Sequence, residues 1–288
     1  MRRLPAGLPA VVLAGLALLT ACQSTGTPGT AGTPGQQAPQ ARDASPAPAD
    51  ARERAALRLQ LASRYLQAGQ SAIALDEARQ AIALDPSLTD AYHVQALAQM
   101  ALRRPAEAEQ SFRAALSRRE DDGDLLNNYG WLLCEQGRYA EGLAQLQRAV
   151  TAAATASSSG GAARTLTSLG ACQLRQGDLA AAHRSLTAAL AQPGTAAPAD
   201  AADAVTHAAA HTQLGLLYWK QGDLPRARAE VAQVNAGRYA SPASLWLGAR
   251  IAHREGDAAA QQALLAQLHK RFPDSRESSA YQQGVRDE

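Results

Sequence analysis

The chain has 288 residues, of which 46% are hydrophobic, 4% aromatic and 19% charged. This length and apolar content suffice for a buried core, and 3 cysteines are too few for a disulfide scaffold. Because 28 basic residues barely outnumber 26 acidic ones, a strongly basic surface for nucleic acid is excluded. Abundant Ala, Leu, Gln and Arg, with few aromatic and β-branched residues, predict an all-α fold and argue against all-β or doubly wound folds.

Residues 1–21 have the pattern of a secretory signal. Arg2 and Arg3 precede an apolar run, Leu8 to Leu19, that is too short for a stable membrane span. The following Leu19-Thr20-Ala21-Cys22 resembles a bacterial lipobox, which implies that Cys22 becomes the first mature residue and carries lipid, including palmitate. Gln23 stands where inner-membrane lipoproteins usually carry Asp, so the resemblance implies the outer membrane. An ordinary signal peptide with a chance cysteine is the alternative.

Residues 22–50 have the composition of a disordered linker. They are rich in Ser, Thr, Gly, Pro, Ala and Gln, which cannot form a packed core. A flexible chain of this length reaches about 30 Å. The folded part, expected at 51–278, can therefore stand away from the lipid surface. Without Arg2 and Arg3 of the signal peptide, the mature protein has 26 basic and 26 acidic residues and is formally neutral.

A period of 34 residues runs through the folded part. Counted from Ala55, the small residues Ala62, Ala74 and Ala81 fall at the eighth, twentieth and twenty-seventh places. The pattern resembles a tetratricopeptide repeat, which implies a right-handed superhelix of about six helix-turn-helix units. The repeats are expected at 55–88, 89–122, 123–156, 163–196, 208–241 and 242–275, with a polar tail at 279–288.

Two intervals between repeat starts exceed the period, at 40 and 45 residues. Loops are therefore expected around Ala156–Ala162 and Pro198–His207. Within each repeat, small residues let two antiparallel helices approach closely. The sixth repeat is expected to be an atypical cap, because Gln261 and Leu268 replace small residues there.

First helices of this repeat class line a concave groove, mainly through the second, fifth, ninth, twelfth and thirteenth places. All three tryptophans fall at these places, which predicts a partner-binding surface for an apolar peptide or amphipathic helix. Internal packing of these rings is the alternative. The candidate groove residues are Leu59, Leu66, Leu97, Met100, Asn127, Trp131, Leu174, Leu216, Trp219 and Trp246, with Arg164, Arg175, Lys220, Arg250 and Arg254 as candidates for polar contacts.

The sequence carries little catalytic equipment. It contains no G-x-S-x-G, phosphate-binding glycine loop or C-x-x-C, so we expect no enzyme, no cofactor and no small-molecule substrate. His207 and His211 lie four residues apart without an evident carboxylate or third ligand, which favours surface or packing histidines over a metal site. Cys134 and Cys172 occupy first helices of adjacent repeats, and they can pair only if their Cα atoms lie within about 7 Å. The sequence leaves this pairing open.

A narrower resemblance rests on longer motifs. The run Leu126-Asn127-Asn128-Tyr129-Gly130-Trp131-Leu132-Leu133-Cys134, the later Leu245-Trp246-Leu247 and the closing Arg271-Phe272-Pro273-Asp274-Ser275 resemble the PilF/PilW family of type IV pilus biogenesis lipoproteins. The resemblance covers roughly residues 55 to 278. It implies a pilotin, an outer-membrane lipoprotein that binds the PilQ-like secretin and supports its localisation and assembly into a multimeric pore.

Two other functions share some of these features. One is another periplasmic adaptor lipoprotein of the same fold, serving cell division, peptidoglycan enzymes or outer-membrane protein assembly. The other is a hydrolase accessory or metal-binding protein. The first would share the anchor and groove but not the secretin, whereas one equivalent of metal in the purified protein would favour the second.

Overall fold

The computed structural model describes residues 48–155, 159–192 and 201–282. The predicted signal peptide, Cys22 and the linker up to residue 47 lie outside these residues. The chain divides between Ser45 and Pro46 into two units, and the description below concerns the second. The described residues form thirteen helices and no strand, which confirms the all-α prediction.

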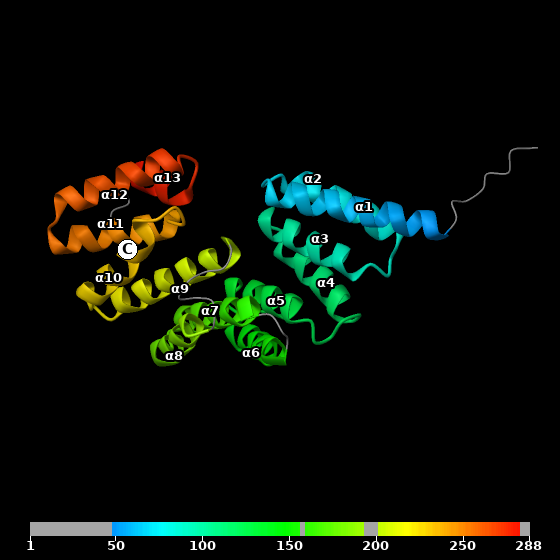
Figure 1. Cartoon of the computed structure of the whole chain (residues 1–288), viewed down its shortest axis with the longest axis horizontal. Coiled ribbons are helices and arrows are strands. Elements are labelled where there is room, and N and C mark those ends of the chain that lie inside the picture. The colour runs from blue at the N-terminus through cyan, green and yellow to red at the C-terminus, as the bar shows by residue number, and fades with distance from the viewer. Residues whose placement is uncertain (1–47, 156–158, 193–200, 283–288) are drawn as a thin grey trace, which may run out of the picture. The chain divides into compact units, whose positions relative to one another are not determined.

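Twelve of the helices form six consecutive hairpins (Figure 1). These are α1 (Pro48–Gln67) with α2 (Ser71–Leu84), α3 (Thr89–Ala101) with α4 (Pro105–Leu116), α5 (Gly123–Glu135) with α6 (Tyr139–Thr155), α7 (Ser159–Gln176) with α8 (Leu179–Leu190), α9 (Ala201–Lys220) with α10 (Leu224–Asn235), and α11 (Pro242–Glu255) with α12 (Ala258–Arg271). A short helix, α13 (Arg276–Gln282), packs on the last hairpin.

The hairpins stack through their first helices. Each odd-numbered helix from α1 to α11 contacts the next odd-numbered helix, and each second helix also contacts the first helix of the following hairpin. Within the described part of the chain, no two second helices contact one another. This arrangement places the first helices in one continuous inner row, as the repeat pattern predicts.

Helix starts are encoded by short polar side chains. The Asp122, Asp178, Asp223 and Asp257 carboxylates accept backbone N–H bonds at the first turns of α5, α8, α10 and α12. Such N-caps satisfy donors that have no partner within the helix. Ser241 and Ser244 form a reciprocal pair at the start of α11, where each hydroxyl accepts the other residue's backbone N–H.

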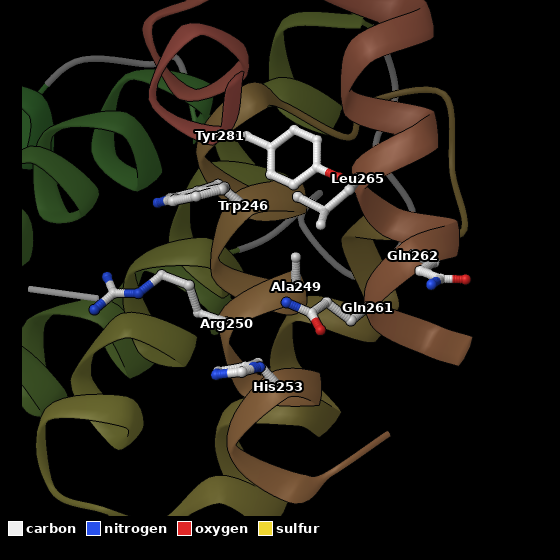
Figure 2. Close-up of a pocket in the computed structure, with 8 residues that line it drawn as sticks. All are labelled: Trp246, Ala249, Arg250, His253, Gln261, Gln262, Leu265 and Tyr281. Carbon is white, nitrogen blue, oxygen red and sulfur yellow. The ribbon is translucent and has the colours of Figure 1, made fainter. Parts of the chain in front are cut away.

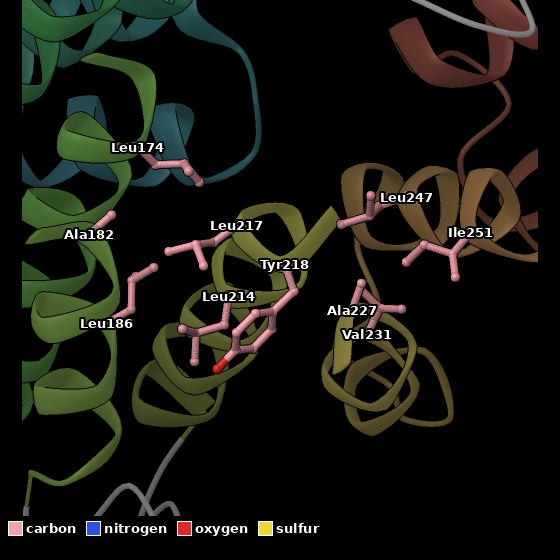
Figure 3. Packing of buried hydrophobic residues seen from close by; sticks show 10 residues of the cluster. All are labelled: Leu174, Ala182, Leu186, Leu214, Leu217, Tyr218, Ala227, Val231, Leu247 and Ile251. Atoms are coloured by element: carbon pink, nitrogen blue, oxygen red, sulfur yellow. The ribbon is translucent and has the colours of Figure 1, made fainter. Parts of the chain in front are cut away.

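The core is a series of clusters between neighbouring hairpins. The largest joins three hairpins, from Leu174 and Leu186 through Leu214 and Leu217 to Ile251 (Figure 3). A second cluster surrounds the fully buried Phe112. Each hairpin therefore buries its apolar face against a neighbour, which no isolated repeat could do.

Gly130 on α5 and Gly142 on α6 mark the closest approach within a hairpin. A Cβ added at Gly130 would lie 2.9 Å from the carbonyl oxygen of Gly142, and one added at Gly142 would lie 2.8 Å from that of Gly130. These are the eighth and twentieth places of the third repeat. The small residues of the repeat pattern thus have the spatial role that the sequence predicts.

The structure corrects several expected boundaries. Ser159–Ala162 and Ala201–His207, expected as parts of loops, are helical and extend α7 and α9 at their N-termini. Alanines favour helix at Ala201–His207 beyond the residues that the repeat pattern marks, whereas Ser159–Ala162 is helical despite Gly160 and Gly161. Similarly, α1 begins at Pro48 inside the expected linker, and α13 includes Ser279–Gln282 of the expected tail. Residues 156–158, 193–200 and 283–288 lie outside the described residues.

Candidate partner-binding surface

The three tryptophans lie on first helices and are half-buried. Trp131 is on α5, Trp219 on α9 and Trp246 on α11. Trp219 packs against the cluster that contains Leu214 and Leu217, and Trp246 packs against the cluster around Leu245. One side of each of these two rings therefore belongs to the core, and the rest of each ring remains at the surface.

Arginines from the following first helix cover two of the tryptophans. The Arg175 guanidinium carbon on α7 lies 5.5 Å from the centre of the Trp131 ring. On α11, Arg250 and Arg254 lie 5.0 and 5.1 Å from the centre of the Trp219 ring. These distances are within the range of cation–π attraction. Guanidinium groups therefore lie beside the indole rings where the sequence predicts an apolar groove.

The third tryptophan borders a cavity of about 240 Å³ at the end of the inner row. Figure 2 shows Trp246, Arg250 and His253 along one side of α11, with Tyr281 of α13 above the tryptophan. Tyr281 is 41% exposed. The sequence pattern did not single out Tyr281, because residues 279–288 were expected to form a polar tail, although an aromatic residue in a polar segment is a signal.

Two candidate groove residues belong to the interior. Leu174 is 1% exposed and packs in the cluster with Leu214 and Leu217, so its place on α7 faces the neighbouring repeat. Asn127 is 3% exposed, and its Nδ2 donates to the Asn128 side chain over 3.3 Å. Both side chains are therefore buried in this structure, and the predicted contact of either residue with a partner stays a prediction. The candidates that remain half-buried are Leu59, Leu66, Leu97, Met100, Trp131, Leu216, Trp219 and Trp246.

Asn128, rather than Asn127, reaches across to the neighbouring first helix. Its Nδ2 lies 2.8 Å from Nε2 of His93 on α3. Burial lowers the pKa of His93 and so favours the neutral ring. A polar chain of His93, Asn128 and Asn127 therefore links the second and third repeats.

The first hairpin exposes an apolar surface of its own. Leu57 and Leu61 on α1 are 54% and 39% exposed, and they line a hollow together with Leu84 of α2. Because no hairpin precedes α1 in the described chain, nothing there covers this face.

His207 and His211 have a carboxylate neighbour that the sequence did not reveal. Their ring centres lie 4.5 Å apart on α9, and His211 Nδ1 lies 2.6 Å from a carboxylate oxygen of Glu230 on α10. Burial and the nearby His211 lower the pKa of His207. No group of three or more potential metal ligands occurs in the described residues.

No helix in the described residues combines the length and hydrophobicity needed to cross a membrane. The inner row instead offers a surface suited to protein contacts. Its side chains are aromatic, aliphatic and cationic.

Models of the tetratricopeptide-repeat family match residues 89–122, 121–192 and 169–234. Together they run from 89 to 234, about half of the chain. The six stacked hairpins and the inner row agree with this match. The chain belongs to the tetratricopeptide-repeat family.

Within this family, the chain is similar to proteins of type IV pili. The type IV pilus assembly protein PilF of Pseudomonas aeruginosa is 36% identical over 91 residues, which cover 32% of this chain and 36% of that protein. The match therefore spans about a third of the curated relative.

Two solved structures extend the likeness over the fold. The structure of P. aeruginosa PilF is 25% identical, with a TM-score of 0.58, and the match covers 82% of this chain and 99% of that one. PilW, described as a widely conserved type IV pilus biogenesis factor, is 28% identical with a TM-score of 0.60, and the match covers 79% and 97% of the two chains. These comparisons confirm the predicted resemblance to the PilF/PilW group.

Proposed function

We propose that this chain is a pilotin, an outer-membrane lipoprotein that binds the type IV pilus secretin and promotes its localisation and multimer assembly. The observation that carries the proposal is the likeness to PilF and PilW over 99% and 97% of their solved chains. Both relatives are named for type IV pilus assembly or biogenesis. In this proposal the chain acts as a non-catalytic adaptor.

Lipid on Cys22 anchors the chain in the outer membrane. The run Leu19-Thr20-Ala21-Cys22 supports this step, since it places a cysteine directly after a hydrophobic segment and two small residues. The linker that follows gives the repeats freedom to reach a partner. A secretin subunit bound to the repeats then travels to the outer membrane with the lipid.

The partner site is the inner row of first helices. Its half-buried tryptophans and leucines present apolar surface that is already held in place by the core. Such anchored aromatic residues are the usual centres of protein interfaces. A secretin segment that covers Trp131, Leu216 and Trp219 would complete the burial of these side chains.

The test is an immunoblot for heat-stable secretin multimers in fractionated membranes. Wild type, a deletion strain and a Cys22→Ser strain are compared. We expect fewer multimers and secretin monomers displaced from the outer membrane in the deletion strain, and a soluble repeat protein in the Cys22→Ser strain. Normal secretin multimers in the outer-membrane fraction of the deletion strain would contradict the proposal.

A groove variant tests the site separately. Trp131→Ala combined with Trp219→Ala should lower secretin affinity while the helical circular-dichroism signal is retained. A matched variant, Leu57→Ser with Leu61→Ser, removes the exposed apolar surface of α1. If only this second variant loses secretin, the terminal hairpin rather than the inner row is the partner site.

The alternative function is a different periplasmic adaptor, which would use the same anchor and groove for cell-division, peptidoglycan or outer-membrane assembly partners. The likeness to PilF and PilW favours the pilus system. Intact pili in a deletion strain would favour the alternative, and crosslinking would then identify the partner.

A further inference from the structure

We propose that the first hairpin is a self-association surface, in which α1 of one copy packs antiparallel against α1 of a second copy around a two-fold axis at Leu57. This inference goes beyond the proposed function, because the partner is the chain itself and the secretin takes no part in the contact. It assigns an occupant to the apolar face that the fold leaves uncovered at its first hairpin.

Leu57 stands at a place that is buried in every other repeat. It is the third residue of the first repeat, and it is 54% exposed. The preceding hairpin supplies the missing cover elsewhere, as Phe112 of α4 does for Leu125 of α5. The face around Leu57 is therefore a repeat contact that lacks its preceding hairpin. The residues at the third place of the other repeats, all at most 2% exposed, are Ala91, Leu125, Thr165, Ala210 and Ser244.

Leu61, one turn further along α1, extends this face. It is the seventh residue of the repeat and is 39% exposed, whereas Leu169 and Leu214 at the same place in the fourth and fifth repeats are 6% and 2% exposed. A hollow of about 640 Å³ lies beside the exposed leucines of α1, and Ala83 and Leu84 of α2 also line it. Adjacent exposed leucines beside an apolar hollow form a patch that a second apolar helix would bury.

Arg64 distinguishes this face from an ordinary repeat contact. It is the tenth residue of the repeat and is exposed. A helix that covers α1 must therefore oppose a carboxylate to Arg64, because an apolar surface would desolvate its charge without compensation. The tenth place of the other repeats carries a hydrophobic residue that is at most 2% exposed, namely Ala98, Leu132, Cys172, Leu217 or Ile251.

α1 carries the matching carboxylate itself. Five of its residues are spaced by 3, 4, 4 and 3 positions and so share one face of the helix; they are Asp50, Glu53, Leu57, Leu61 and Arg64. The spacing is symmetric about Leu57. In an antiparallel pair with its two-fold axis at Leu57, Asp50 of each copy lies opposite Arg64 of the other, and Glu53 adds a second carboxylate one turn away. The face is therefore self-complementary, as the interface of a two-fold dimer must be.

The charges of this hairpin permit the pairing. No ion pair within the described part of the chain involves Asp50 or Arg64, so both are available to a second copy. Arg58 is already paired with Glu77 of α2 over 2.9 Å. Arg54 would lie opposite an uncharged glutamine of the other copy, because the residue as far beyond Leu57 is Gln60.

The rest of the chain does not supply another cover. Residues 23–47 contain no Leu, Ile, Val, Met, Phe, Tyr or Trp, so they lack the large apolar side chains that would bury the leucines of α1. At the last hairpin, α13 contacts α11 and α12 in the way that each first helix contacts the hairpin before it, and Ser278 is fully buried. Head-to-tail stacking of copies would have to displace α13. A contact between two α1 helices leaves α13 in place and closes as a dimer.

This dimer is compatible with the lipid anchor proposed at Cys22. α1 begins at Pro48, nine residues before Leu57, so its two starts lie about 27 Å apart at 1.5 Å per residue. Each linker reaches about 30 Å. The lipids of both copies can therefore enter one bilayer.

The experiment traps the contact in membranes of a strain that lacks the secretin, with the full-length protein followed by non-reducing immunoblot. Leu57→Cys puts a thiol on the proposed axis, where the two copies approach within the Cα separation of about 7 Å that a disulfide bond allows. We expect a band at twice the monomer mass that a reductant removes. Arg52→Cys is the matched control and should stay monomeric, because Arg52 is exposed on the opposite side of α1.

Charge reversal tests the two-fold arrangement. In the Leu57→Cys background, Arg64→Asp and Asp50→Arg each turn both ion pairs of the dimer into like-charge contacts. Either change alone should slow crosslinking about tenfold, since two exposed ion pairs are replaced by repulsion. Co-expression of the two variants with different epitope tags should restore crosslinking between them, because their charges then match across the axis. The restored heterodimer would also show that both variants fold.

Leu57→Cys without a dimer band, an equal band from Arg52→Cys, or no restoration on co-expression would overturn the inference. A Leu57→Cys crosslink to a different protein would assign this face of α1 to that partner and overturn it as well. The secretin immunoblot decides the pilotin proposal separately. Loss of secretin multimers in the deletion strain without a Leu57→Cys dimer leaves only the pilotin proposal standing, whereas a dimer together with normal multimers in the deletion strain leaves only this one.

Discussion

Cys134 on α5 and Cys172 on α7 form a disulfide bond, with their Cα atoms 5.7 Å apart. Both residues are fully buried, and they share a cluster with Leu146 and Leu169. The bond joins the first helices of two neighbouring hairpins. It therefore fixes the third repeat against the fourth at the place where Trp131 and Arg175 meet across the same two helices.

Removal of this bond should destabilise the repeat domain. The two cysteines are 38 residues apart, and closing a loop of that length stabilises a protein by up to about 4 kcal/mol in the chain-entropy model. Urea unfolding of the Cys134→Ala, Cys172→Ala variant should show a lower midpoint. A reductant should lower the midpoint of wild type and leave that of the variant unchanged; an equal effect on both would contradict the role of the bond.

Gly142 should tolerate no side chain. A Cβ there would lie 2.5 Å from the Cys134 sulfur and 2.8 Å from the Gly130 carbonyl oxygen, so α6 would have to move away from α5. We expect Gly142→Ala to cost at least about 1–3 kcal/mol, as overpacked cores do. Gly123→Ala is the control, because its nearest neighbour would be the Ala152 Cβ at 3.6 Å, an ordinary contact. Thermal melts that show equal losses for the two variants would contradict this explanation.

The repeat pattern predicted much of the fold because its small residues mark helix-to-helix contacts that recur in each repeat. It placed first helices at Thr89, Gly123 and Pro242, where α3, α5 and α11 begin. It could not place the beginnings of α7 and α9. The segments Ser159–Ala162 and Ala201–His207 lie outside the repeated contacts. Alanines give Ala201–His207 helix propensity, but Gly160 and Gly161 disfavour helix in Ser159–Ala162, so nothing in that segment marked it as helical.

The candidate site was predicted less completely. A place in the repeat gives a direction around the helix, but burial depends on how closely the next helix approaches. Leu174 has a groove place and is nevertheless 1% exposed, because α9 brings Leu214 and Leu217 against it. The cation–π contacts of arginines with Trp131 and Trp219 depend on distances between hairpins, which no single repeat encodes.

Replacing Arg103 with glycine should stabilise the folded protein. Arg103 has a φ of 59° in the turn between α3 and α4, a left-handed conformation that costs a residue with a Cβ about 1–2 kcal/mol. The corresponding turns of the other five hairpins use Gly69, Gly137, Gly177, Gly222 and Gly256, all with positive φ. Arg103→Gly should raise the melting temperature by a few degrees. Arg104→Gly, at a neighbouring residue with φ −112°, should not; stabilisation by both would point to charge rather than backbone conformation.

His93 should make stability fall in mild acid. Burial lowers the pKa of His93 below its usual 6.5. The charge of Arg119 lowers this pKa further, whereas the charges of Asp122, Asp124 and Asp90 raise it. The unfolded chain then binds a proton near pH 6.5 that the folded chain resists, so stability is full above this pH and declines below it. Because the pKa of His207 is also lowered, His207 also reduces stability in acid. The contribution of His93 is therefore measured as the difference between wild type and a His93 variant. His93→Gln should lose less melting temperature between pH 7.5 and 5.5 than wild type, and an identical loss would contradict the assignment.

Gln99 and Ser111 form a buried hydrogen bond that the small-residue pattern does not show. The Ser111 hydroxyl donates to Gln99 Oε1 over 2.8 Å, between the eleventh and twenty-third places of the second repeat. The fourth repeat has the same bond, from Ser185 to Gln173, also at 2.8 Å. Ser111→Ala leaves the buried amide oxygen without this donor, which should cost about 1–3 kcal/mol.

The equivalent change in the fourth repeat provides the comparison. Gln173 is half-buried, whereas Gln99 is 3% exposed, so water can replace the lost hydroxyl more easily beside Gln173. Urea unfolding should therefore show a larger loss for Ser111→Ala than for Ser185→Ala. Restoring an apolar pair with Gln99→Leu and Ser111→Ala should recover part of the loss, because no buried polar atom is then left unsatisfied. A double variant that is less stable than Ser111→Ala would show that packing, rather than the hydrogen bond, is what this position requires.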